Sequence, residues 1–86
     1  MGKYEVIVSK SAAKELSKLP VQVNNKIVPA ILALEENPRP SGSKKLKGGS
    51  NTWRIRIGDY RVVYSVDDEI LIVDVRKVGH RKDIYE

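Results

Sequence analysis

The sequence contains no cysteine, so it can form neither a disulfide framework nor a thiolate metal site, and nothing in it indicates an oxidising compartment. It also lacks any apolar run near the roughly 18 residues of a membrane span, and its opening MGKYEVIV has no signal-peptide core. We therefore expect a soluble, cytoplasmic protein. The chain has a single histidine, and its acidic run 67–69 falls in a predicted turn. These features argue against a catalytic metal ion, and we expect no cofactor.

The composition is that of a globular protein, with 41% hydrophobic and 31% charged residues among 86. A chain this short has little core to divide, so we expect one domain spanning 1–86. Between 44 and 64, six basic residues accompany only Asp59, and this segment accounts for the whole net charge of +5. The six are Lys44, Lys45, Lys47, Arg54, Arg56 and Arg61. Such a basic excess favours a polyanion such as a phosphate backbone, although a merely solvated basic face is the alternative.

The first half of the chain predicts a strand followed by two helices. Apolar and polar residues alternate from 3 to 9, as a half-buried strand requires. Apolar residues then recur at helical spacing from about 10 to 19, behind serines that can cap a helix start. A second apolar stripe from 20 to 36 predicts an antiparallel second helix. The prolines and glycines of 37–52 predict a loop.

A β-hairpin is the clearest structural signal. Residues 53–57 alternate strictly, and Gly58-Asp59 supplies a two-residue turn whose leading glycine suits type II′ geometry. This turn predicts that Ile57 faces Tyr60, Arg56 faces Arg61, Ile55 faces Val62, Arg54 faces Val63 and Trp53 faces Tyr64. The apolar and aromatic residues then share one face, so we assign the rings of Trp53, Tyr60 and Tyr64 to the core rather than to base stacking.

The opposite face of the hairpin collects Arg54, Arg56 and Arg61. Arg56 would lie directly across from Arg61, and like charges so placed destabilise a sheet by about a few tenths of a kcal/mol. We therefore expect an anion between these guanidinium groups, most simply an RNA phosphate. The alternative is that Asp74 neutralises them, because a tight turn at 67–68 would place it opposite Arg61. That turn would also pair Leu71 with Tyr64, Val73 with Val62 and Val75 with Tyr60.

Two motifs, WRIRIGDYRVVY and then VGHRKDIY, resemble the RelE/ParE superfamily of bacterial type II toxins, and the likeness covers nearly the whole chain. The resemblance implies an α+β fold, in which an N-terminal strand and a two-helix hairpin pack on a mostly antiparallel sheet of about four strands. The chain looks closer to the RelE branch, whose toxins cut mRNA. They use basic residues on the sheet, an arginine after the last strand and a tyrosine near the C-terminus.

The same resemblance implies roles for individual residues. Arg54, Arg56 and Arg61 match the basic sheet positions, Arg81 matches the late arginine, and Tyr85 matches the C-terminal tyrosine. The best-known members carry lysine at the positions of Arg54 and Arg56, which is a departure that bears on mechanism. Arg81 is then the expected stabiliser of the transition state.

RNA cleavage without a metal needs a base for the ribose 2′-OH, positive charge on the phosphorane and an acid for the leaving 5′-oxygen. The guanidinium group of arginine keeps its proton in proteins, so arginine cannot serve as a base. The arginines should therefore bind phosphate and stabilise charge. Tyr85 is the first candidate base, because nearby guanidinium groups favour its phenolate, although it could simply pack on the sheet. His80 could be the acid or share the base role, or its ring could only stack or cap a turn. We expect Lys44, Lys45 and Lys47 to steer phosphate, or to form only a solvated loop.

We therefore expect the toxin of a type II toxin–antitoxin system, acting as a ribosome-dependent mRNA interferase. It would cleave by 2′-OH attack, leave a 2′,3′-cyclic phosphate and be held inactive by a cognate antitoxin. The ribosome and the antitoxin follow from the resemblance alone. Two alternatives are a ParE-like inhibitor of DNA gyrase that cuts nothing, and a non-catalytic RNA-binding module.

Overall fold

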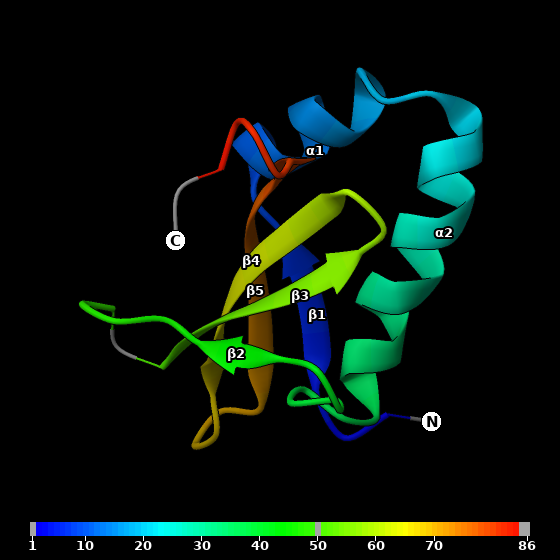
Figure 1. Cartoon of the computed structure of the whole chain (residues 1–86). Helices are drawn as coiled ribbons and strands as arrows, with labels where there is room; N and C mark the ends of the chain where they lie inside the picture. Colours follow the sequence, from blue (N-terminus) through cyan, green and yellow to red (C-terminus); the bar gives the residue numbers. More distant parts are fainter. Residues whose placement is uncertain (1, 50, 85–86) are drawn as a thin grey trace.

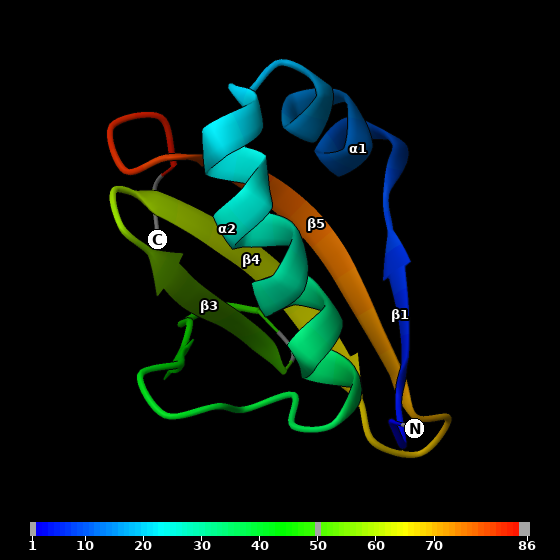
Figure 2. The same cartoon turned by 90° about the vertical axis from the view of Figure 1, so that its right-hand side faces the viewer.

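Two helices lie against one face of a β-sheet in the computed structural model, which describes residues 2–49 and 51–84 (Figures 1 and 2). The elements in chain order are β1 (Glu5–Val8), α1 (Lys10–Ser17), α2 (Val21–Leu32), the 3-10 turn η1 (Ala33–Glu35), β2 (Lys44–Lys45), β3 (Thr52–Ile57), β4 (Tyr60–Asp67) and β5 (Ile72–His80). The strand order is β1-β5-β4-β3-β2, and β1 alone runs parallel to its neighbour. The predicted α+β class is confirmed.

The short strand β2 is the element that the sequence did not predict. Lys44 and Lys45 lie within the segment assigned to a loop, yet they pair with Arg54 and Trp53 of β3. The sheet of the described residues therefore has five strands rather than about four. Neither α1 nor α2 is long and apolar enough to cross a membrane, and no other described helix is.

The helices begin where the sequence predicts them. Ser9 caps α1, because its side-chain oxygen accepts the Ala12 N–H at 3.1 Å. Glu15 of α1 reaches across to β5, where its Oε1 accepts the Val78 N–H at 3.2 Å. This bond satisfies a backbone donor on β5 beyond the end of the short strand β1, whose pairing stops at Val75. It also fixes α1 against the sheet.

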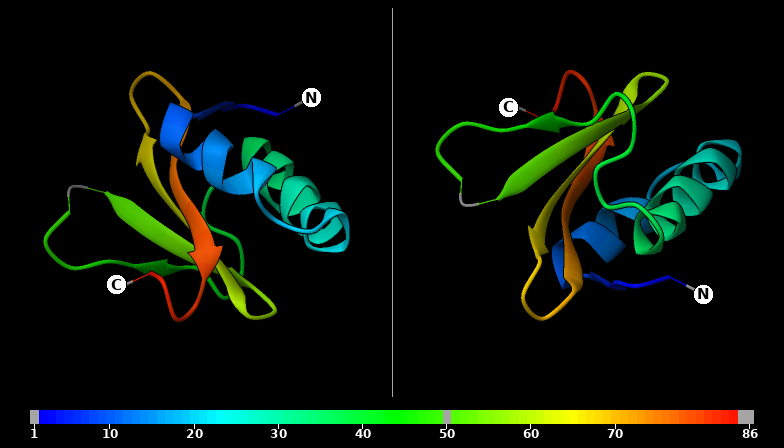
Figure 3. Two further views of the ribbon diagram at one scale, coloured as in Figure 1. Left: turned by 90° about the horizontal axis from the view of Figure 1, so that it is seen from above. Right: turned by 90° about the horizontal axis from the view of Figure 1, so that it is seen from below.

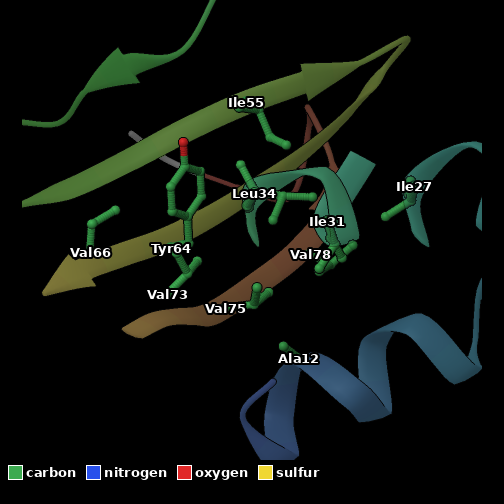
Figure 4. Close-up of a cluster of buried hydrophobic side chains, with 11 residues drawn as sticks. Ala12, Ile27, Ile31, Leu34, Ile55, Tyr64, Val66, Val73, Val75 and Val78 are labelled. Carbon is green, nitrogen blue, oxygen red and sulfur yellow. The ribbon is translucent and has the colours of Figure 1, made fainter. Parts of the chain in front are cut away.

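The core lies between the sheet and the helices (Figure 4). Its buried side chains are Ala12, Ile27, Ile31, Leu34, Ile55, Val62, Tyr64, Val66, Val73, Val75 and Val78. Five of these eleven are valines of β4 and β5, whose β-branched side chains suit a pleated, half-covered surface. Tyr64 is the largest fully buried side chain, and its hydroxyl donates to the Pro38 carbonyl at 2.6 Å. The core thus also holds the segment that precedes β2.

The predicted register of the β3–β4 hairpin is confirmed at every pair from Ile57–Tyr60 to Trp53–Tyr64. Gly58 has a φ of +60°, which the first position of a type II′ turn requires and which glycine adopts without steric cost. The side chains of Trp53 and Tyr60 pack against the core cluster, as predicted for structural aromatic residues. The arginines of this hairpin consequently lie on the face that points away from the helices.

The predicted register of β4 and β5 is wrong. Tyr64 pairs with Val75, Val62 with Val78, Tyr60 with His80 and Arg61 with Gly79. The turn spans 68–71 rather than 67–68, because Asp67 Oδ1 accepts the N–H groups of Glu69 (3.0 Å) and Ile70 (3.2 Å) and Leu71 takes a φ of +57°. A bulge that leaves Arg76 without a partner residue shifts the pairing further.

This correction removes the alternative in which Asp74 neutralises the arginine pair. Asp74 lies opposite Ser65, and its carboxylate is 3.3 Å from the guanidinium of Arg76. Gly79 takes the place opposite Arg61. The residue facing Arg61 on β5 therefore has no side chain, and the Ile84 side chain packs against the place that one would take.

A polar network joins the segment before β3 to the β4–β5 turn. Arg39 donates to Asp68 Oδ2 at 2.6 Å, and the Tyr4 hydroxyl donates to Asp68 Oδ1 at 2.7 Å. The Arg39 guanidinium also lies 5.3 Å from the ring centroid of Trp53, whose Nε1 donates to Asn51 at 2.9 Å. The hydrogen bond from Arg39, and next that from Tyr4, lower the pKa of Asp68 to about 2.

We expect this network to make the fold sensitive to acid. A folded-state pKa of about 2 for Asp68 lies below the value of about 4 of an unfolded aspartate, so its stabilisation is present above about pH 4 and is lost as the pH falls toward 2. Asp68→Asn should lower the thermal midpoint at neutral pH and flatten its decline below pH 4. Melting curves from pH 7 to 2 test this, with the exposed neighbour Glu69→Gln as the control. Parallel curves for wild type and Asp68→Asn would contradict it.

Candidate functional site

Figure 3 shows both helices on one side of the sheet, and no described helix covers the other face. Basic side chains gather on that uncovered face. Residues directly opposite each other in an antiparallel ladder point to the same face. Arg56 lies opposite Arg61, Lys44 opposite Arg54, and Lys77 opposite Val63, which itself faces Arg54. We call this set the basic face; it comprises Lys44, Arg54, Arg56, Arg61 and Lys77.

The arginine pair at the centre of the basic face lies where the sequence predicts it. Arg56 is exposed and Arg61 is half-buried, and their Cβ atoms stand about 5 Å apart by the geometry of directly opposed residues. Two guanidinium groups at this separation can bind one phosphate from both sides through charge-assisted hydrogen bonds. The pair is therefore suited to an anion that it can share.

Arg54 differs from the expectation of an exposed phosphate ligand. It is on the predicted face, but only 4% of its surface is exposed, and it interacts with other groups of the protein. A guanidinium stays charged even when buried. Arg54 thus contributes positive potential from beneath the basic face, while Arg56 and Lys44 are exposed to solvent.

Arg81 lies at the same end of the sheet as the arginine pair. Its backbone N–H donates to the Asp59 carbonyl at 2.7 Å, and its Nε is 3.8 Å from Asp59 Oδ1. It follows by two residues Gly79, which stands opposite Arg61. Its side chain is 58% exposed, so a ligand on the basic face can reach it without displacing core residues.

His80 lies on the other face of the sheet from the arginine pair, because it pairs with Tyr60. The two rings meet edge to face, with centroids 5.4 Å apart. His80 Nδ1 accepts the Lys82 N–H at 3.2 Å, and its carbonyl accepts the Asp83 N–H at 2.8 Å. These are the contacts of a ring that stacks and caps a turn, the second of the two interpretations that the sequence allows. Because Nδ1 accepts a hydrogen bond, the hydrogen of a neutral imidazole ring would be on Nε2.

Tyr85 lies outside the described residues, whose last member is Ile84. The Ile84 side chain is buried, with 6% exposed, and lies 3.3 Å from the position that a Cβ on Gly79 would occupy. A side chain at position 79 would therefore displace Ile84. Because Gly79 stands opposite Arg61, this contact places the Ile84 side chain on the same face as the arginine pair.

The three lysines of the predicted phosphate-steering segment are separated by the structure. Lys44 is on the basic face, whereas Lys45 pairs with Trp53 and so has its Cβ on the opposite side. Lys47 lies beyond β2 and is exposed. Among the residues that the structure describes, no cluster of three or more His, Asp or Glu side chains is arranged to hold a metal ion.

Lys77 is the member of the basic face that sequence reasoning missed. The erroneous β4–β5 register placed it beyond the hairpin, whereas it lies opposite Val63. A signal was present in the sequence. The buried residues Val73, Val75 and Val78 break the two-residue period between 75 and 78, and such a break indicates a bulge.

Comparisons with known proteins agree with this fold. Residues 6–85 match the family described as the ParE toxin of type II toxin-antitoxin system, parDE. The chain is 37% identical to RelE1 of Methanocaldococcus jannaschii, over 98% of this chain and 97% of that protein. It is similar to the archaeal RelE–RelB complex from Pyrococcus horikoshii, with a TM-score of 0.83, 30% identity and coverage of 95% of this chain and 99% of the matched chain.

The Escherichia coli RelBE toxin–antitoxin complex gives a TM-score of 0.79 at 32% identity, over 90% of this chain and 95% of the matched chain. The matched family extends over both motifs, from the hairpin of β3 and β4 to the residues after β5. The chain therefore belongs to the RelE/ParE superfamily of type II toxin–antitoxin toxins.

Proposed function

We propose that this toxin is a ribosome-dependent endoribonuclease that cleaves mRNA without a metal ion. The observation that supports this most is the pairing of Arg56 with Arg61 across β3 and β4, with Arg81 at the same end of the sheet. Like charges in directly opposed positions destabilise a sheet. A phosphate bound between them reverses that cost, so the arrangement is understandable as a ligand site.

The proposed reaction begins with attack of the ribose 2′-oxygen on the adjacent phosphorus, while the bond from phosphorus to the 5′-oxygen breaks. A 2′,3′-cyclic phosphate and a 5′-hydroxyl result. Arg56, Arg61 and Arg81 bind the phosphate and stabilise the negative charge of the phosphorane. The 2′-hydroxyl proton goes to a base and the leaving oxygen takes a proton from an acid.

We assign the base to Tyr85, because a cluster of guanidinium groups favours a phenolate. His80 is the other candidate for proton transfer, through Nε2; its ring lies on the opposite face of the sheet, against Tyr60, so this role would require the ring to leave that contact. Weak catalysts of this kind gain most from a substrate held in the reactive geometry. This dependence on positioning supports a role for the ribosome, which would present the mRNA.

We also propose that a cognate antitoxin inhibits the toxin. Similar chains are found in complexes of RelE with the antitoxin RelB, including those from Pyrococcus horikoshii and Escherichia coli. An inhibitor that covers the basic face would compete directly with RNA. Acidic or disordered segments that fold on binding are suited to such a surface.

We expect the purified protein to cut mRNA on programmed ribosomes and to leave 2′,3′-cyclic phosphate ends. Primer extension maps the breaks, and treatment with a cyclic phosphodiesterase identifies the ends. A supercoiling assay with DNA gyrase runs in parallel, because the matched family is described by ParE toxins. Intact mRNA together with inhibited gyrase would refute the proposed reaction.

A further inference from the structure

A cleft of about 480 Å³ lies beside the outer edge of β3, next to the basic face. Ala30 of α2 and Ala33 of η1 form one wall, and the segment 40–42 closes one end. The strand side is formed by 54–57. In Figure 2, β3 and the C-terminal half of α2 flank this region, with the segment before β2 below it. The walls are mostly apolar and the rim carries Arg56.

The backbone at this edge presents one donor and one acceptor. In the β3–β4 ladder the residues Ile55 and Ile57 direct their N–H and C=O groups toward β4, because Ile57 pairs with Tyr60 across the two-residue turn. The groups of alternate residues point outward; Arg54 lies opposite Lys44 of β2, and the Thr52 carbonyl accepts the Leu46 N–H at 2.8 Å. Since β2 ends there, the N–H and C=O of Arg56 face the cleft without a neighbouring strand.

This pattern fits a nucleobase better than an added peptide strand. A strand that joined the sheet here would find outward backbone groups on Arg56 alone, too few for a ladder. A base needs only one adjacent donor and acceptor, which each of the four RNA bases offers on an edge. The apolar walls suit the faces of a purine, and the cleft volume is within the range of about 300–1,000 Å³ for small-molecule sites.

We propose that this cleft is a subsite for one unstacked base of the bound RNA, preferentially a purine. The phosphate next to that base would lie on the basic face, where Arg56 and Lys44 are exposed. The backbone of Arg56 would read the base while its side chain binds the phosphate. This inference rests on the proposed RNA-binding function.

The test compares oligoadenylate with an abasic ribose-phosphate chain of the same length, which carries the same phosphates. Binding is measured by fluorescence anisotropy, with deoxyribose at the cleavable positions. We expect wild type to bind the abasic chain about tenfold more weakly, the effect of losing two net hydrogen bonds. Ala33→Leu fills the cleft and should abolish this difference without changing the affinity for the abasic chain.

The matched control is Ala13→Leu, the same change at an exposed alanine of α1 away from the cleft, which should behave as wild type. If wild type bound both chains equally and Arg56→Ala weakened this binding, the base subsite would be refuted, whereas RNA binding by the basic face would still be supported. Absence of binding to either chain would overturn both. Weaker capture of an antitoxin by Ala33→Leu, with unchanged discrimination between the chains, would assign the cleft to a protein partner and refute the subsite.

Discussion

Replacing Arg81 by alanine is expected to lower the rate of mRNA cleavage on the ribosome about 100-fold or more, while the protein stays folded. Arg81 is 58% exposed, and its side-chain partner is Asp59 at 3.8 Å, so truncation removes little packing. Its backbone N–H, which holds the turn on the Asp59 carbonyl, is unaffected. The loss should appear in kcat rather than in KM if the guanidinium acts mainly on the phosphorane.

Lys82→Ala is the matched control for this variant. It removes the same charge from the neighbouring position of the same turn, where Lys82 is exposed and contributes only its backbone N–H to the contact with His80. We expect its cleavage rate to stay within about twofold of wild type, as for surface changes in general. Arg81→Lys should recover part of the activity by restoring charge without the planar fork. Equal losses for Arg81→Ala and Lys82→Ala would indicate a general charge effect and contradict a specific role of Arg81.

The β3–β4 hairpin could be predicted residue by residue because its information is local. A two-residue turn that begins with Gly58 permits one register, and strict alternation of apolar and basic residues then assigns both faces. The structure reproduces all of these pairs. The sequence alone therefore predicts that Arg56 lies opposite Arg61.

The β4–β5 connection could not be predicted in the same way. Its turn depends on an aspartate side chain that binds two backbone N–H groups and on Leu71 in the left-handed region. Leucine rarely adopts that conformation, so no local rule points to it. The acidic residues at 67–69 fit a tighter turn equally well, and the observed register is the one that pairs Val78 with Val62 and buries it in the core.

The residues of the candidate site could likewise be predicted only in part. Side chains on the hairpin were assigned to the correct face, but their burial depended on elements distant in sequence. Arg54 is 4% exposed, and Lys44 shares its face only because β2 pairs there. Lys77 entered the basic face through the bulge of β5. Charge density along a sequence thus indicates a polyanion site, whereas its exact members require the tertiary pairing.

Replacing Tyr64 by alanine is expected to lower the free energy of unfolding by about 3–5 kcal/mol, the usual cost of deleting a buried aromatic ring. Tyr64 is fully buried and lies between Trp53 and Val75 in adjacent strands. A loss of this size approaches the whole stability of a typical small domain, about 5–15 kcal/mol. The variant should therefore be largely unfolded near 37 °C, as circular dichroism and urea titration would reveal.

Tyr64→Phe separates the hydrogen bond from the packing, because it keeps the ring and leaves the Pro38 carbonyl without its 2.6 Å donor. We expect the free energy of unfolding to fall by about 1–3 kcal/mol, against less than about 0.5 kcal/mol for the control Tyr60→Phe, whose ring is only partly buried.

Burial raises the pKa of Tyr64 from its ordinary value of 10.0 to about 12. The neutral phenol is thus favoured by folding, and this stabilisation is lost as the pH rises from about 10 to 12. Tyr64→Phe should remove that part of the alkaline decline, and an unchanged decline would mean that ionisation of the buried Tyr64 hydroxyl does not contribute to it.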